Sequence, residues 1–241
     1  KNMKPKKEQL FYFDAEWVPI SKNLEEFEAD YPALYEAFVH QYKKKGGDII
    51  NERKNLEEKK EGMTLQEFWE EKAHFYPEFC KIICISYGYY YNDTFIIKSL
   101  YGDDEKKLLT SFQEVLNKAT KAGLYLAGYA IKRFDMPWVS KRMMVNNIAP
   151  PNCISFYGKK PWEIEVFDLP EVWGQGSMGE SYTPFELACA ALGIESSKGD
   201  LDGSKVKFAY WDGEIERIKT YCEKDVQKSA ELAEKLITLL P

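Results

Sequence analysis

The sequence predicts a mixed α/β fold in which helices cover a sheet, and three observations support this. Residues 11–19 alternate between faces as a strand does, and two β-branched and aromatic runs flank a short polar break at Asn92 and Asp93. Farther along, amphipathic helical segments alternate with short buried strands. The chain has 241 residues and is 44% hydrophobic, enough to bury a sizeable core.

The first strand is followed by helical segments. Residues 24–45 carry apolar side chains at helical spacing and end in a lysine run before two glycines, which predicts one helix and its end. Residues 48–62 are highly charged. Thr64 and Glu67 then match a capping box, which predicts that a second helix begins there.

The next two runs, 81–91 and 94–102, predict a hairpin, because Asn92 and Asp93 suit a tight turn. Together with the first strand they predict three antiparallel strands. The remaining predicted elements, by periodicity, are a helix at 104–119, a strand at 123–129, a helix at 134–147, a strand at 162–169 and helices at 183–194 and 213–240.

The domain organisation predicted from this order is one domain over residues 9–241. Residues 17–79 are interpreted as a helical insertion between the first and second strands, since they hold few large apolar runs.

Charge and composition exclude several classes of protein. A net charge of −6 does not fit binding of nucleic acid through bulk electrostatics, although it leaves room for a nuclease whose acids attract metal. No apolar stretch is long enough for a membrane span, and the basic start lacks the pattern of a signal peptide, so we expect a cytoplasmic protein without a membrane partner. The 5 cysteines form no CxxC pair and fit reduced thiols, and 2 histidines are too few for a three-histidine zinc site.

Two acids interrupt the first strand. Asp14 and Glu16 are two residues apart and therefore share a face of the strand, opposite Phe13, Ala15 and Trp17. Two desolvated like charges repel each other, at a cost of several kcal/mol without a partner. The pair therefore predicts a nearby cation or a wet face.

Three further residues have ordinary interpretations when taken singly. Asp135 follows a buried strand at the expected start of a helix, where an aspartate often caps the helix. Tyr221 and Asp225 are four residues apart on the last helix and share a face of it, as many surface residues do.

Taken together, the order of the acids and the tyrosine resembles that in the DEDD exonucleases, specifically in the subgroup that carries a tyrosine. The segments YPEFCKIICISYG, GYAIKRFDMPWV, FDLPEVW, LACAALGI and DLDGSKV are similar to the predicted 3′-to-5′ exonucleases related to the proofreading domain of family B DNA polymerases. The resemblance covers about residues 9–237 and is weakest over 17–79. It implies an RNase H-like fold, a mixed sheet of three antiparallel strands followed by parallel strands and flanked by helices.

Two pairs of residues bear on how far the resemblance extends. Thr220 and Tyr221 favour the tyrosine subgroup over the histidine subgroup of the same superfamily. Many relatives have His-Asn before the second acid motif, where this chain has Tyr129 and Ala130, so an amide that would contact the substrate strand is absent.

The resemblance also implies a metal-dependent chemistry. Carboxylates are hard oxygen ligands suited to Mg²⁺ or Mn²⁺, and two such ions can stabilise the attacking and leaving oxygens of a phosphodiester. By the resemblance, Asp14 bridges both ions, Glu16 and Asp225 complete the nucleophile-side ion, Asp135 holds the second, and Tyr221 orients the attacking water.

The function expected from the resemblance is 3′-5′ exonuclease action on single-stranded 3′ ends, with DNA preferred to RNA and nucleoside 5′-monophosphates released. An exoribonuclease of the same superfamily and a non-catalytic nucleic-acid-binding module are the alternatives, and a polymerase or other replication or repair partner is left open. Base-stacking candidates beside the motifs are Trp17, Phe134 and Tyr129, and candidate phosphate contacts are Lys132, Lys141 and Lys198.

Overall fold

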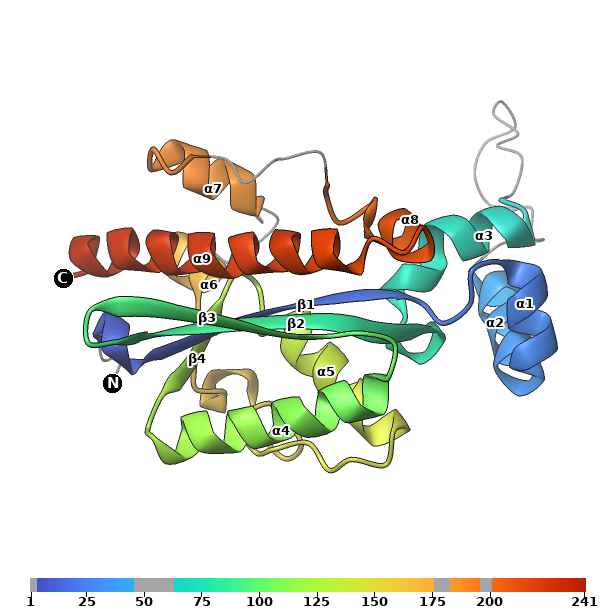
Figure 1. Ribbon diagram of the computed structural model, residues 1–241, viewed down its shortest axis with the longest axis horizontal. Coiled ribbons are helices and arrows are strands. Elements are labelled where there is room, and N and C mark those ends of the chain that lie inside the picture. Colours follow the sequence, from blue (N-terminus) through green and yellow to red (C-terminus); the bar gives the residue numbers. More distant parts are fainter. Residues whose placement is uncertain (1–3, 46–62, 176–182, 196–200) are drawn as a thin grey trace. The chain divides into compact units, whose positions relative to one another are not determined.

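The computed structural model describes residues 4–45, 63–175, 183–195 and 201–241. Its single described sheet has five strands in the order β3-β2-β1-β4-β5. β2 and β3 pair antiparallel, whereas β4 runs parallel to β1 and β5 runs parallel to β4. Figure 1 shows that β1 and β2 run in opposite directions. The prediction of antiparallel strands followed by parallel strands is confirmed. The strands are β1 (Leu10–Pro19), β2 (Cys80–Tyr91), β3 (Thr94–Tyr101), β4 (Tyr125–Gly128) and β5 (Val166–Asp168).

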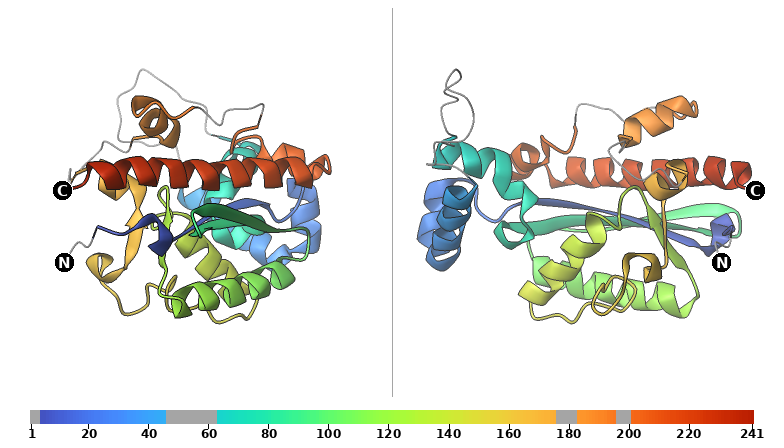
Figure 2. Two further views of the ribbon diagram at one scale, coloured as in Figure 1. Left: turned by 60° about the vertical axis from the view of Figure 1, so that its left-hand side comes forward. Right: turned by 180° about the vertical axis from the view of Figure 1, so that it is seen from behind.

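Helices cover both faces of this sheet. The long helix α9 lies along one face and contacts β3, β4, α6 and α8, whereas α4 and α5 pack together on the other face (Figures 1 and 2). No helix in the described ranges combines the length and the apolar character needed to span a membrane. The helices are α4 (Glu105–Lys121), α5 (Asp135–Val145), α6 (Leu169–Trp173), α7 (Phe185–Ala191), α8 (Val206–Trp211) and α9 (Ile215–Leu239), with 3₁₀ turns η1 (Lys7–Gln9) and η4 (Pro161–Glu163).

The alternation of β1 decides which side chains face α9. Leu10 and Tyr12 are fully buried in one apolar cluster with Val226 and Ala230 of α9. The odd-numbered neighbour Phe13 points to the other face, where its ring packs 5.4 Å from that of Phe112 on α4. Because side chains alternate along a strand, the next even-numbered residues, which are acidic, continue the face that lies under α9.

The described chain divides into two compact units, one of residues Lys1–Glu16 and Ile82–Pro241 and the other of Trp17–Lys81. The second unit contains α1 (Leu24–Asp30), α2 (Pro32–Lys44), α3 (Leu65–Lys72) and the 3₁₀ turns η2 (Ala73–Phe75) and η3 (Pro77–Phe79). It has its own aromatic core, in which the rings of Phe27 and Trp69 stack 4.4 Å apart. The aromatic residues of this unit occur singly or in pairs among polar residues, which is why the sequence shows no long apolar run there.

Two predicted elements differ from the structure. The single helix expected over 24–45 is two helices, because Pro32 starts α2 and forces the preceding Tyr31 out of helical geometry (φ −134°, ψ 56°). The strand expected over 162–169 begins only at Val166, because residues Pro161–Glu163 form a 3₁₀ turn. The charged stretch 48–62 lies outside the residues that the structure describes.

Other local predictions are confirmed. Asn92 and Asp93 both have positive φ, 48° and 59°, as the type I′ hairpin turn requires. Thr64 and Glu67 exchange the two hydrogen bonds of a capping box at the start of α3.

Gly128 ends β4 at a close approach of two segments, and this leads to a prediction. A Cβ atom at this position would lie 2.4 Å from Cγ2 of Ile131 and 3.1 Å from the carbonyl oxygen of Phe13. We expect Gly128→Ala to lower the free energy of unfolding by about 1–3 kcal/mol, as overpacking does elsewhere. A chemical denaturation curve measures this change.

Gly203 provides the matched control, because a Cβ there meets no atom of the described residues within 4 Å. Gly203→Ala should leave the unfolding midpoint close to that of the wild type. If both variants unfold at the wild-type midpoint, the close packing at Gly128 does not contribute to stability.

Candidate active site

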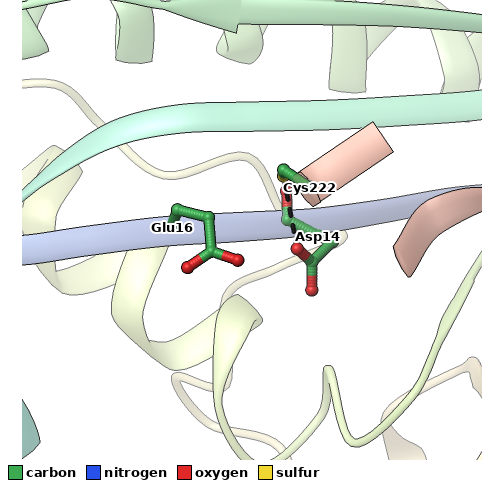
Figure 3. Close-up of side chains that lie close together, drawn as sticks. All are labelled: Asp14, Glu16 and Cys222. Carbon is green, nitrogen blue, oxygen red and sulfur yellow. Dashed lines mark hydrogen bonds between the residues drawn. The ribbon is translucent and has the colours of Figure 1, made fainter. Parts of the chain in front are cut away.

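β1 presents Asp14 and Glu16 on the face that lies under α9. Their carboxylate oxygens and the sulfur of Cys222 all lie within 4.8 Å of one another. Figure 3 shows the two carboxylates side by side on the strand, with Cys222 next to Asp14. The flanking Ala15 is buried, whereas the two acids are partly exposed. The strand periodicity therefore places both acids in one half-open site, as predicted.

Asp135 reaches the same strand from α5. Its side chain is 5% exposed, and Oδ1 accepts the backbone N–H of Ala15 at 3.0 Å. Phe134, not Asp135, occupies the N-cap position of α5. The helix-capping interpretation of Asp135 is therefore wrong, because its carboxylate is bound to the backbone between Asp14 and Glu16.

The helix α9 supplies Tyr221 and Asp225. Tyr221 and Asp225 are both partly exposed, and Asp225 is among the groups that raise the pKa of the Tyr221 phenol. The charge of Asp225 acts on Asp14, Glu16 and Asp135, since it raises the pKa of each of them. The tertiary structure thus brings together all five residues selected from the sequence, from β1, α5 and α9.

Burial and mutual repulsion raise the pKa values of Asp14, Glu16 and Asp135. Desolvation by the surrounding protein, followed by the charges of Asp135 and Asp225, raises the pKa of Asp14 well above its usual value. Desolvation and then the charge of Asp14 do the same to the pKa of Glu16. Burial raises the pKa of Asp135 to about 7, although the Ala15 N–H opposes the shift. Without a cation, keeping these acids ionised is therefore costly.

Cys222 also belongs to this cluster. From the sequence it was expected to be an ordinary reduced thiol. Its sulfur donates to Oδ2 of Asp14 at 3.2 Å and approaches the Asp14 carbonyl oxygen at 3.4 Å. Burial is the main cause of the raised pKa of this thiol, so it acts as a neutral donor. The sequence signal for this contact was the position of Cys222 directly after Tyr221. Because a helix turns by 100° per residue, Cys222 points in a different direction from Tyr221 and lies toward the sheet.

The aromatic candidates for base stacking have different surroundings. The Tyr129 hydroxyl donates to the Thr183 carbonyl oxygen, and its ring packs against that of Phe185, so this side chain has a structural role. The Trp17 indole N–H donates to the carbonyl oxygen of His74 within the second unit. Phe134 is 36% exposed next to Asp135. Of the three, Phe134 combines exposure with proximity in sequence to the acidic site.

The candidate phosphate contacts also differ. Lys132 forms an ion pair with Glu171 at 2.7 Å, whereas Lys141 is exposed on α5. Lys198 lies outside the described residues. Lys141 is therefore the more accessible of the two described lysines.

Comparison with solved structures identifies the fold. The chain resembles a structure of the family B DNA polymerase from the hyperthermophilic archaeon Pyrobaculum calidifontis, with a TM-score of 0.53 and 14% sequence identity over 95% of the chain. This chain spans 24% of the length of that polymerase chain. The RNase H-like α/β fold expected from the sequence is thereby confirmed. No curated protein matches the chain significantly.

The sequence also matches a family model over residues 72–229, described as a predicted 3′-5′ exonuclease related to the exonuclease domain of PolB. The chain belongs to this family. The match includes Asp135, Tyr221 and Asp225, whereas Asp14 and Glu16 precede it. The class of protein is therefore an exonuclease, an enzyme for which dependence on divalent metal is the general expectation.

The raised pKa values lead to a prediction about stability. Because the folded pKa of Asp135 is about 7 and its ordinary value is 3.8, the folded protein binds more protons than the unfolded chain between these values. The stability of the metal-free protein should therefore fall as the pH rises through this window. Mn²⁺ relieves the repulsion between ionised acids, so it should raise the melting temperature more at about pH 8 than at about pH 5.5.

Differential scanning fluorimetry of chelator-treated protein, with and without millimolar Mn²⁺ at both pH values, measures this difference. Asp135→Asn is the matched variant and should flatten the pH dependence of the metal-free protein. A melting temperature that Mn²⁺ leaves unchanged at both pH values would contradict a preformed metal site.

Proposed function

We propose that this chain is a two-metal 3′-5′ exonuclease that acts on single-stranded 3′ ends, DNA in preference to RNA, and releases nucleoside 5′-monophosphates. The observation that carries the proposal is the convergence of Asp14 and Glu16, Asp135 and Asp225 from three elements into one electrostatically coupled site. The preference for DNA is supported by the relationship of the family to a DNA polymerase domain.

The donor set fits Mg²⁺ or Mn²⁺. All four proposed ligands, Asp14, Glu16, Asp135 and Asp225, are carboxylates, the hard oxygen donors that these ions take. Burial and mutual repulsion raise the pKa values of Asp14, Glu16 and Asp135, as expected where like charges are clustered. When bound, the ions would neutralise this cluster, acidify a water molecule and stabilise charge on the phosphodiester oxygens.

Tyr221 is proposed to orient the attacking water. Desolvation, followed by the charges of Glu16, Asp225 and Asp14, raises the pKa of its phenol above the ordinary value of 10.0. The hydroxyl therefore stays protonated at neutral pH and acts through hydrogen bonding rather than as a base. The charges that act on this phenol come from Glu16, Asp225 and Asp14, all proposed metal ligands, so the hydroxyl is close to the proposed metal site.

Phe134 is proposed to support the terminal nucleotide. Its ring is partly exposed and the guanidinium carbon of Arg133 lies 5.2 Å from the ring centroid, so an aromatic face and a positive charge adjoin Asp135. Aromatic faces stack on bases without regard to sequence, which suits an enzyme that removes successive nucleotides.

Digestion of matched 5′-labelled DNA and RNA oligonucleotides, with Mg²⁺ or Mn²⁺ and with a chelator control, tests the proposal. We expect a ladder that shortens from the 3′ end, faster on DNA, with monophosphates as the products. An oligonucleotide with a blocked 3′ end is the matched substrate control and should persist. Faster digestion of RNA would favour the exoribonuclease alternative, whereas binding without digestion would favour a non-catalytic module.

A further inference from the structure

Asp168 is a buried acid whose side chain does not serve the helix that it precedes. It ends β5 and occupies the N-cap position of α6, where an aspartate ordinarily accepts an N–H of its own helix, but it makes no such cap bond. Its side chain is 4% exposed, and Oδ1 accepts the backbone N–H of Lys132 at 3.3 Å. The carboxylate therefore binds the turn between β4 and α5.

This turn has an unusual backbone. Ala130 has a φ of 59°, in the left-handed region that a residue with a Cβ adopts at a cost of about 1–2 kcal/mol. A left-handed residue beside right-handed ones turns successive N–H groups toward one point and makes a concavity for an anion. The Asp168 carboxylate is the anion at this point. The Lys132 side chain also connects the turn to α6, through its ion pair with Glu171.

The same turn is hydrogen-bonded to the start of α5. The Ala130 carbonyl oxygen accepts the N–H groups of Arg133 and Phe134, both at 3.0 Å, and the Ile131 carbonyl oxygen accepts that of Met136 at 2.9 Å. Asp135 lies between these donors. A continuous path of hydrogen bonds thus joins the Asp168 carboxylate to the backbone that carries Asp135.

We propose that Asp168 is a positioning residue, which holds the turn over residues 130–134 and thereby sets where the Asp135 carboxylate lies against β1. This inference rests on the proposed function, because it takes Asp135 to be a metal ligand. Residues that orient metal ligands typically change metal affinity by about 10–100-fold when they are replaced. A residue that only stabilised the loop would change the melting temperature and leave metal affinity unaltered.

The test compares Mn²⁺ affinity by calorimetry with thermal stability in Asp168→Ala and Asp168→Asn. Alanine removes both acceptor oxygens, and we expect Mn²⁺ affinity to fall about tenfold or more. Asparagine keeps one oxygen that can accept the Lys132 N–H, so its loss of affinity should be smaller. In the digestion assay both variants should lose kcat while KM for the oligonucleotide stays close to that of the wild type.

Asp104→Ala is the matched control, since this aspartate accepts the N–H of Lys107 at the start of α4. It should lower the melting temperature without changing Mn²⁺ affinity. Wild-type Mn²⁺ affinity in whichever Asp168 variants fold would overturn the positioning role. Absence of Mn²⁺ binding by the wild-type protein would instead overturn the proposed function, so the two failures are distinguishable.

Discussion

Asp14→Ala should abolish exonuclease activity while the protein remains folded. The charges of Asp135 and Asp225 act on the Asp14 carboxylate, which lies beside Glu16 and is proposed to bind both ions. Loss of a ligand shared by both proposed ions should remove several kcal/mol of transition-state stabilisation, a decrease in rate of roughly 10³-fold or more. Digestion of a 5′-labelled DNA oligonucleotide under single-turnover conditions measures this decrease.

The same substitution should have the opposite effect on stability. In the metal-free protein, Asp14→Ala removes a desolvated charge that repels its neighbours, so the melting temperature should rise above that of the metal-free wild type. Asp212→Ala, purified identically, replaces an exposed aspartate on the loop after α8 and controls for contaminating nuclease. Near wild-type digestion by Asp14→Ala, with Asp212→Ala equally active, would show that the acids of β1 are not catalytic.

Tyr221→Phe and Asp225→Asn should both lower turnover, but only Asp225→Asn should also lower Mn²⁺ affinity. The phenylalanine keeps the ring but lacks the hydroxyl proposed to align the water, so turnover should fall by roughly 10²-fold or more while Mn²⁺ affinity persists. Asp225→Asn weakens a proposed ligand, so both Mn²⁺ affinity and turnover should decrease. Calorimetric Mn²⁺ titration beside single-turnover digestion separates the two outcomes.

Gln227→Ala provides a control on the same helix, because Gln227 is exposed and bonds only along the helix surface to Glu231 in the described structure. It should match the wild type in both measurements. If Tyr221→Phe digests DNA at the wild-type single-turnover rate, the tyrosine serves packing alone. A fall in Mn²⁺ affinity in Tyr221→Phe would instead assign its hydroxyl to the support of Asp225.

Local sequence was sufficient to predict much of the fold. The Asn92–Asp93 turn and the capping box at Thr64 depend on contacts within a few residues, so their side chains determine their geometry wherever they lie in the protein. The end of α1 before Pro32 also depends on neighbouring residues alone. Helical periodicity on both sides of this proline led to the prediction of one helix instead of two.

The candidate site was predictable only in part. Alternation along β1 places Asp14 and Glu16 on one face, and helical spacing places Tyr221 beside Asp225, because both relations follow from backbone geometry alone. That these two pairs and Asp135 meet came from the resemblance to a known family, since nothing in the residues between them specifies how α9 lies on the sheet.

Periodicity and residue type were enough to predict most of the strands and helices, their polar faces and the identity of the acids. Two contacts could be found only in the folded protein: Cys222 donates to Asp14, 208 positions away, and Asp168 binds the turn before Asp135 instead of capping α6. These contacts depend on the rotation of α9 over β1 and on the left-handed backbone at Ala130. Both result from packing between distant segments, whose many weak contacts act together and leave no signal in any short stretch of sequence.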